Sequence, residues 1–191
     1  MDTGESTPRR RMRADARRNY ERLLAAAATA FTERGTDASL EEIARRAGVA
    51  NGTLYSHFPT RQALLEALLG DRMRALAATG EELLDHSSPF EALAAWARTA
   101  VTHTARYRGL GASLMRAIED ESSELHAACE AVLAASERLV ARARAAGELR
   151  EDVTAPDLYA LVNAVAWVSE QSSPAQGERL LTFALNGLRA R

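Results

Sequence analysis

Apolar residues recur every three to four positions along almost the whole 191-residue chain, and segments that alternate with a period of two are missing. This spacing predicts amphipathic helices and no strands. In the first predicted helix, from about Asp15 to Glu33, one face carries Tyr20, Leu23, Leu24, Ala27 and Phe31. The chain is therefore expected to be all-α, with about nine helices.

Local signals predict where these helices begin and end. Starts are indicated by a hydroxyl residue followed three positions later by an acid or amide, in "SLEE" from Ser39, "SPFE" from Ser88, "TAPD" from Thr154 and "SPAQ" from Ser173. In such a capping box the second side chain, Glu42 or Glu91 for example, is expected to reach back to the backbone of the cap. Ends are indicated by glycines after apolar runs, at Gly35, Gly48 and Gly147. Further helices are expected over 110–120, 123–146, 155–171 and 174–189, and the last two have wide apolar faces that predict burial on more than one side.

The stretch "GVANGTLYSHFPTR", residues 48–61, interrupts this pattern with poor helix formers. If residues 51–58 form a helix that Pro59 stops, Leu54 and Phe58 face inward. The outer surface then consists of short hydrogen-bonding groups, as a helix in the DNA major groove requires. With the short helix before it and "GVA" as the turn, the stretch predicts a helix-turn-helix. An ordinary short helix with a solvated face is the alternative.

Charge is unevenly distributed along the chain, whose net charge is −2. Residues 1–74 carry 13 Arg against 10 acids, whereas residues 75–191 carry 11 Arg against 16 acids. Residues 1–14 are expected to form a disordered basic arm, with Arg9, Arg10, Arg11 and Arg13 suited to a DNA minor groove. A solvated tail is the alternative interpretation.

Several classes of protein are disfavoured by composition. No apolar stretch approaches the roughly 20 residues that span a bilayer, and the N-terminus lacks the apolar segment of a signal peptide, so we expect a soluble, cytoplasmic protein without membrane contact. The single cysteine, Cys129, agrees with a reducing compartment. His126 and Cys129, three residues apart and near several acids, lack the second pair that a metal site needs. We expect no metal, no cofactor and no enzymatic activity, because no catalytic grouping emerges.

The sequence over about residues 15–65 resembles that of a known family. "FTERGTDASLEEIARRAG" followed by "GVANGTLYSHFPTRQALLEAL" closely resembles the DNA-binding domain of the tetracycline-repressor (TetR) family of bacterial transcription regulators. The resemblance implies a helix-turn-helix DNA-binding domain over 15–60 and a helical ligand-binding and dimerisation domain over 61–191. It further implies a homodimer that binds a roughly palindromic operator in double-stranded DNA and represses until an unidentified small molecule binds.

The resemblance also implies roles for individual residues. Phosphate contacts are expected from Tyr55, His57 and Arg61, and base contacts from Asn51, Gly52, Thr53 and Ser56. Ala50 stands where the family often has a capping Ser, so the cap is missing or is made by Asn51. Because Glu41 and Glu42 disfavour phosphate approach at the start of the preceding helix, Ser39 is the expected phosphate contact there.

For the C-terminal domain, family analogy implies a ligand pocket and a dimer interface. The predicted lining is Trp96, His103, Tyr107, Met115, Ile118, His126 and Trp167, each with plain core packing as the alternative. The last two helices are expected to pair with their counterparts in a four-helix interface. An all-helical interaction module that no longer binds DNA is a further interpretation. A regulator should lose affinity for duplex DNA steeply as salt rises, whereas such a module should bind no duplex specifically.

Overall fold

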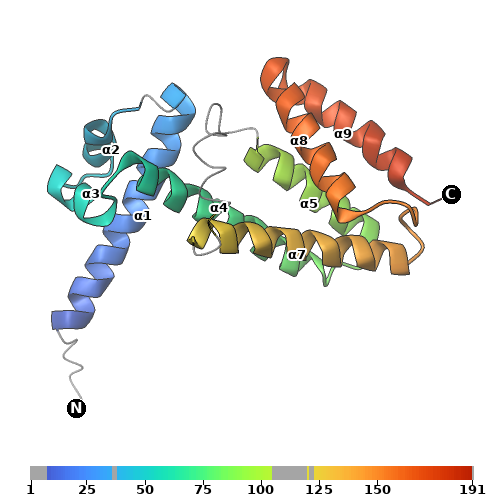
Figure 1. Cartoon of the computed structure of the whole chain (residues 1–191), viewed down its shortest axis with the longest axis horizontal. Helices are drawn as coiled ribbons and strands as arrows, with labels where there is room; N and C mark the ends of the chain where they lie inside the picture. The colour runs from blue at the N-terminus through green and yellow to red at the C-terminus, as the bar shows by residue number, and fades with distance from the viewer. Residues whose placement is uncertain (1–7, 36–37, 105–119, 121–122, 191) are drawn as a thin grey trace, which may run out of the picture. The chain divides into compact units, whose positions relative to one another are not determined.

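The computed structural model describes residues 8–35, 38–104, 120 and 123–190 (Figure 1). Eight α-helices account for most of them, and no strand is formed within these ranges. The all-α prediction is therefore confirmed, whereas the helix predicted over 110–120 lies almost entirely outside the described residues. Every helix in the described ranges is too short or too polar to cross a membrane. The chain divides into two compact units, Met1–Leu68 and Leu69–Arg191.

The N-terminal unit is built from α1 (Pro8–Arg34), α2 (Leu40–Arg46), α3 (Asn51–His57) and the start of α4 (Arg61–Leu83). Its fully buried core contains one leucine or isoleucine from each helix, namely Leu23, Ile43, Leu54 and Leu64. Because Leu64 and the buried Leu68 lie on α4, the unit ends inside that helix. The predicted boundary lies earlier, after residue 60.

Helix α1 begins at Pro8, seven residues before the predicted start at Asp15. Residues 8–14 are therefore helical, which corrects the expectation of a disordered arm over the whole of 1–14. Proline is favoured in the first turn of a helix, where its fixed φ suits the backbone and its missing N–H costs nothing. The following Arg, Met and Ala residues are good helix formers, so the basic run extends the helix. The side chains of Arg9, Arg10 and Arg11, like residues 1–7, lie outside the described part.

The predicted helix ends agree with the structure. Gly35, Gly48 and Gly147 all have φ between 62° and 68°, the left-handed conformation that glycine adopts without strain. A side-chain oxygen accepts a backbone N–H three residues later at the starts with Ser39, Thr60, Ser88, Ser123, Thr154 and Ser173. These local signals therefore operate as expected.

Among the helix starts that the structure describes, the reciprocal half of the capping box forms only at Thr154, whose backbone N–H donates to Asp157. At the two other starts with an acid, the prediction is wrong. Glu42 pairs with Arg34 and Arg46, and Glu91 pairs with Arg189. A guanidinium is a stronger partner for a carboxylate than a neutral backbone amide, so tertiary pairing takes these side chains away from the cap.

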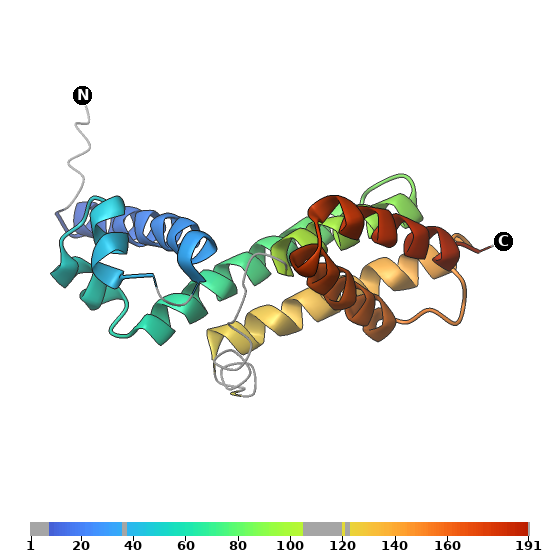
Figure 2. The ribbon, with the colours of Figure 1, turned by 90° about the horizontal axis from the view of Figure 1, so that it is seen from above.

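The C-terminal unit contains the end of α4 together with α5 (Pro89–Thr104), α7 (Glu124–Ala145), α8 (Ala155–Gln171) and α9 (Pro174–Leu188). Figures 1 and 2 show α8 and α9 side by side, with α8 packed on α5 and α5 beside α7. Trp96 lies in the core, and its indole Nε1 donates to the carbonyl of Leu76, 3.2 Å away. The buried indole N–H is therefore satisfied within this unit.

A carboxylate distant in sequence completes the start of α5. Glu148, from the connection between α7 and α8, accepts the backbone N–H of Phe90 at 2.8 Å and the Ser88 hydroxyl at 3.3 Å. The same connection meets the end of α9, where Arg150 N–H donates to the Leu188 carbonyl and Ala190 N–H to the Glu148 carbonyl. The negative charge of Glu148 stabilises the N-terminus of α5. The connection between α7 and α8 is thus bonded both to the start of α5 and to the end of α9.

Candidate functional site

The helix-turn-helix consists of α2, α3 and a four-residue connection. Gly48, with φ of 65°, makes the turn, and the N–H of Val49 returns to the Ala44 carbonyl at 3.0 Å. Any other residue at position 48 would be strained, because the left-handed conformation brings its Cβ too close to the backbone. The predicted glycine turn is therefore present between two short helices.

One side of α3 is anchored in the N-terminal unit. Leu54 and Phe58 are buried, and the Tyr20 ring of α1 lies 5.2 Å from the Phe58 ring and 6.0 Å from the His57 ring. Aromatic contacts of this kind add to the free energy gained from burial. The packing holds in place a helix whose own residues have low helix propensity.

The remaining positions of α3 reach the surface. The exposed residues are Asn51, Gly52, Tyr55 and Ser56, while Thr53 and His57 are half-buried. Asn51 is the first helical residue after Ala50, and no side chain caps the helix. The Ser56 hydroxyl donates to the Gly52 carbonyl at 2.8 Å, which leaves its oxygen free to accept a further hydrogen bond. The structure thus places six of the predicted DNA contacts together on one short helix, Tyr55 among them.

The other predicted contacts gather around Glu41, in the first turn of α2. Its carboxylate accepts the Ser39 hydroxyl at 2.6 Å and, at the long distance of 3.5 Å, the Tyr55 hydroxyl. These bonds, that of Ser39 first, lower the pKa of Glu41, and the charge of Arg61 lowers it further. Arg61 also donates to the Ala38 carbonyl at 2.5 Å. The contact between Glu41 and Tyr55 was not predicted from the sequence, because the two residues lie 14 positions apart.

A network of charged side chains fastens α2 to the end of α1. Arg46 pairs with Glu33 at 2.8 Å and with Glu42 at 2.7 Å, and Glu42 also pairs with Arg34. The Arg46 hydrogen bond is the main cause of the lowered pKa of Glu42. Networks of this kind fix geometry better than an isolated surface pair.

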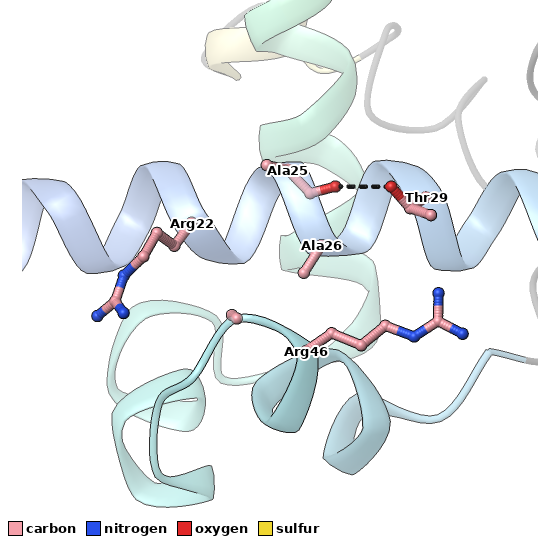
Figure 3. Close-up of a pocket in the computed structure, with 6 residues that line it drawn as sticks. Arg22, Ala25, Ala26, Thr29 and Arg46 are labelled. Atoms are coloured by element: carbon pink, nitrogen blue, oxygen red, sulfur yellow. Dashed lines mark hydrogen bonds between the residues drawn. The ribbon is translucent and has the colours of Figure 1, made fainter.

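An open hollow of about 370 Å³ lies beside this network, between α1 and the end of α2 (Figure 3). It is lined by Arg22, Ala25, Ala26, Thr29, Arg46 and Ala47, and Figure 3 shows the Arg22 and Arg46 side chains pointing in opposite directions. Arg46 is already paired with two carboxylates, and Arg22 donates to the side-chain oxygen of Asn19 at 2.5 Å. We assign it no ligand.

The residues predicted to line a ligand pocket are placed differently from one another. Trp96 is buried in the core, His103 and His126 are half-buried, and Trp167 is 63% exposed. Tyr107, Met115 and Ile118 lie outside the described residues. Within one chain, Trp167 is therefore at the surface and not in an enclosed cavity. The described residues contain no group of three or more His, Cys, Asp or Glu able to hold a metal ion.

Large apolar side chains reach the surface of α8 and α9. The exposed residues are Tyr159, Trp167, Leu180 and Phe183, of which Phe183 is 68% exposed. Their buried neighbours Leu158, Val162, Leu181 and Leu185 face the core, so each helix is apolar on two sides. Exposed aromatic side chains in neighbouring helices indicate a surface that another protein covers.

Two families match separate parts of the chain. Residues 23–68 match the bacterial regulatory proteins of the tetR family, and residues 88–190 match the C-terminal domain of SbtR-like transcriptional regulators. A TetR transcriptional regulator from Streptomyces coelicolor is 37% identical, with a TM-score of 0.74 over 90% of this chain and 98% of the other. A TetR transcription regulatory protein from Mycobacterium vanbaalenii is 34% identical, with a TM-score of 0.67 over 94% and 99% of the two chains.

Curated relatives match over shorter segments. The regulator TtgW of Pseudomonas putida is 38% identical over 68 residues, which is 35% of this chain and 51% of that protein. The transcriptional repressor KstR2 of Mycolicibacterium smegmatis is 37% identical over 75 residues, 38% of this chain and 37% of that protein. The chain thus matches about half or less of the length of these curated relatives.

Proposed function

We propose, from the premise that the chain belongs to the tetR family of bacterial regulatory proteins, that it is a homodimeric repressor of a roughly palindromic operator. Family and fold are those of DNA-binding transcriptional regulators. The observation that carries the DNA-binding part of the proposal is α3, a helix with a buried apolar side and an outer face of small hydrogen-bonding groups. Such a face fits the major groove.

Each polar residue of the unit has a proposed role. Asn51, Gly52, Thr53 and Ser56 approach base edges, and the Asn51 amide is suited to a bidentate pair with adenine. Phosphates are contacted by the remaining four residues, Ser39, Tyr55, His57 and Arg61. Phosphate contacts set the orientation of the protein on the duplex, whereas base contacts set its sequence preference.

The C-terminal unit supplies dimerisation and regulation in this proposal. The exposed aromatic and aliphatic residues of α8 and α9 pair with the same residues of a second copy, as a two-fold symmetric interface requires. A small molecule of unknown identity binds this unit and changes the affinity for DNA, which requires that it bind the DNA-competent and DNA-free forms differently. The protein acts where the chromosome is, in the cytoplasm.

Selection from a random duplex library tests the proposal. The purified protein should enrich a two-fold palindrome at moderate salt, and Tyr55→Ala should abolish the enrichment. Leu133→Ala, which truncates an exposed side chain on α7, is the control and should enrich the same sequence. If the folded wild-type protein enriches nothing, the DNA-binding proposal is wrong and an interaction module becomes the better description.

Two single variants separate the proposed roles on the recovered operator. Tyr55→Phe should weaken binding to all duplexes similarly, because a phosphate contact carries no sequence information. Asn51→Ala should relax the preference at one base pair by about 1–3 kcal/mol. Fluorescence anisotropy with single-substitution operators measures both effects. A change of sequence preference in Tyr55→Phe at unchanged overall affinity would contradict the assignment.

A further inference from the structure

We propose that the Glu41 carboxylate is an internal substitute for a DNA phosphate, holding the hydroxyls of Ser39 and Tyr55 in the free protein and yielding them to the backbone when DNA binds. The inference rests on the proposed DNA-binding function and adds to it a residue that limits affinity. Binding then exchanges one anion for another at the same hydroxyl donors.

The geometry of the cluster supports this exchange. The two Glu41 oxygens are used separately, one by Ser39 at 2.6 Å and the other by Tyr55 at 3.5 Å. Glu41 is exposed and Tyr55 is 43% exposed, so the cluster lies at the surface of the N-terminal unit. Ser39 and Glu41 come from the start of α2 and Tyr55 comes from α3, on either side of the turn of the helix-turn-helix.

A carboxylate and a phosphate oxygen compete for the same donors. Both are anionic acceptors, and a hydroxyl has a single proton to donate. A phosphate that approaches Tyr55 and Ser39 must also come close to the negative charge of Glu41. The repulsion between the two negative charges opposes binding, and it weakens as salt screens them. The neighbouring Arg61 charge favours whichever anion is present.

The competition explains why an acid is compatible with a DNA-facing surface. Without Glu41, the hydroxyls and Arg61 would attract the backbone of any duplex. With Glu41, every duplex must first displace an internal partner, so affinity stays moderate. A regulator that has to release its operator when a ligand binds benefits from such a limit, because a smaller change in affinity is then sufficient for release.

Replacing Glu41 should therefore strengthen binding. We expect Glu41→Gln to raise the affinity for the operator and for a mixed-sequence 30-base-pair duplex by roughly three- to tenfold at low salt, with a smaller gain as salt rises. Glu21→Gln removes the same charge from α1, where the partner of Glu21 is Arg17, and should change affinity by less than about twofold. A gain in affinity cannot come from partial unfolding, which only weakens binding.

A double-mutant cycle tests the link to Tyr55. In the wild type, Tyr55→Phe loses a phosphate contact but also removes a bond that DNA must displace. In the Glu41→Ala background there is no internal bond to displace, so Tyr55→Phe only loses the phosphate contact. Tyr55→Phe should therefore cost about two- to threefold more affinity there than in the wild type. Equal costs in both backgrounds would overturn the exchange.

The outcomes separate this inference from the proposed function. If the wild type enriches an operator but Glu41→Gln binds it no better, the inference alone fails. A loss confined to the operator would mean that Glu41 reads a base instead. If neither the wild type nor the variants bind any duplex, the proposed function fails and the inference fails with it.

Discussion

The two units of the chain follow the same packing rules but expose opposite kinds of surface. Both bury leucine and alanine side chains between helices. On the N-terminal unit, α3 presents small polar groups such as Asn51 and Ser56, whereas on the C-terminal unit α8 and α9 present large apolar ones such as Trp167 and Phe183. A polar, hydrated face suits nucleic acid, and an exposed aromatic face suits another protein. The comparison shows that the outer helical face, and not the fold class, indicates the partner.

Two helical glycines illustrate the same difference. A Cβ added at Gly52 on α3 would meet nothing within 4 Å. One added at Gly80 on α4 would lie 2.8 Å from the Ala135 Cβ and 3.1 Å from the Trp96 indole nitrogen. Gly52 therefore leaves the outer surface of α3 without a side chain at that position, and Gly80 leaves room for the side chains of Ala135 and Trp96.

The largest effect is expected from placing charge on the apolar surface of α8 and α9. Trp167→Arg combined with Phe183→Arg should raise the dissociation constant of the dimer by at least about a hundredfold, because a central interface side chain contributes 2 kcal/mol or more and an unpaired buried charge adds to the loss. Operator affinity should fall too, since two linked half-site contacts bind far more tightly than one. Sedimentation velocity and anisotropy measure the two effects.

Leu133→Arg is the matched control for this double variant. Leu133 is an exposed leucine on α7, outside the proposed interface. Its replacement should leave the dimer intact. If the double variant remains as dimeric as this control, the apolar faces of α8 and α9 do not form the dimer interface.

The glycines provide the next test. Gly80→Ala should lower the free energy of unfolding by about 1–3 kcal/mol, because the added methyl group overpacks the contact with Ala135 and Trp96. Gly52→Ala should leave stability unchanged or raise it by about 0.5–1 kcal/mol, since alanine is the better helix former. Operator binding should nevertheless weaken in Gly52→Ala and persist in folded Gly80→Ala. Denaturant titration with anisotropy gives both values, and the reverse pattern would contradict the distinction.

The smallest effect concerns the capping box of α8. Thr154→Ala should lower the free energy of unfolding by about 1 kcal/mol through loss of the cap. The hydrogen bonds from Thr154 lower the pKa of Asp157 in the folded protein. The stability that this carboxylate contributes is therefore present above its unfolded-state pKa, near 4, and is lost as the pH falls through the lower folded-state value.

Denaturation of the wild type and of Asp157→Asn at several pH values between 6 and 3 measures this contribution. The variant should lose less stability across that range than the wild type does. Equal losses would show that the lowered pKa of Asp157 makes no net contribution. Glu42 has a lowered pKa in the N-terminal unit, so Glu42→Gln allows the same comparison there.

The correct predictions rested on short-range signals. Gly35, Gly48 and Gly147 end their helices because only glycine adopts positive φ without strain, and the hydroxyl caps act on a backbone N–H three residues away. Helical periodicity likewise identified the buried side of α3 from Leu54 and Phe58. The DNA-contact roles assigned to the outer side remain predictions.

Most of the incorrect or missing predictions involve partners distant in sequence, and the exception is the start of α1 at Pro8, which follows from local helix signals. Glu42 was assigned to its own cap but pairs with Arg34 on α1, and nothing near Glu148 in the sequence indicates that it completes the start of α5. Trp167 lies at the surface of the chain, because periodicity does not tell which of two apolar sides faces the core, and its assignment to a ligand pocket remains a prediction.

The sequence by itself therefore determined the helices, the turn of the helix-turn-helix and the polar character of α3, because each depends on the conformational preferences of residues within about one helical turn. Only the tertiary structure decided which carboxylate meets which donor, including the cluster of Glu41 with Ser39 and Tyr55. The physical reason is that a charged side chain takes the strongest partner within its reach, and folding alone sets which groups come within reach.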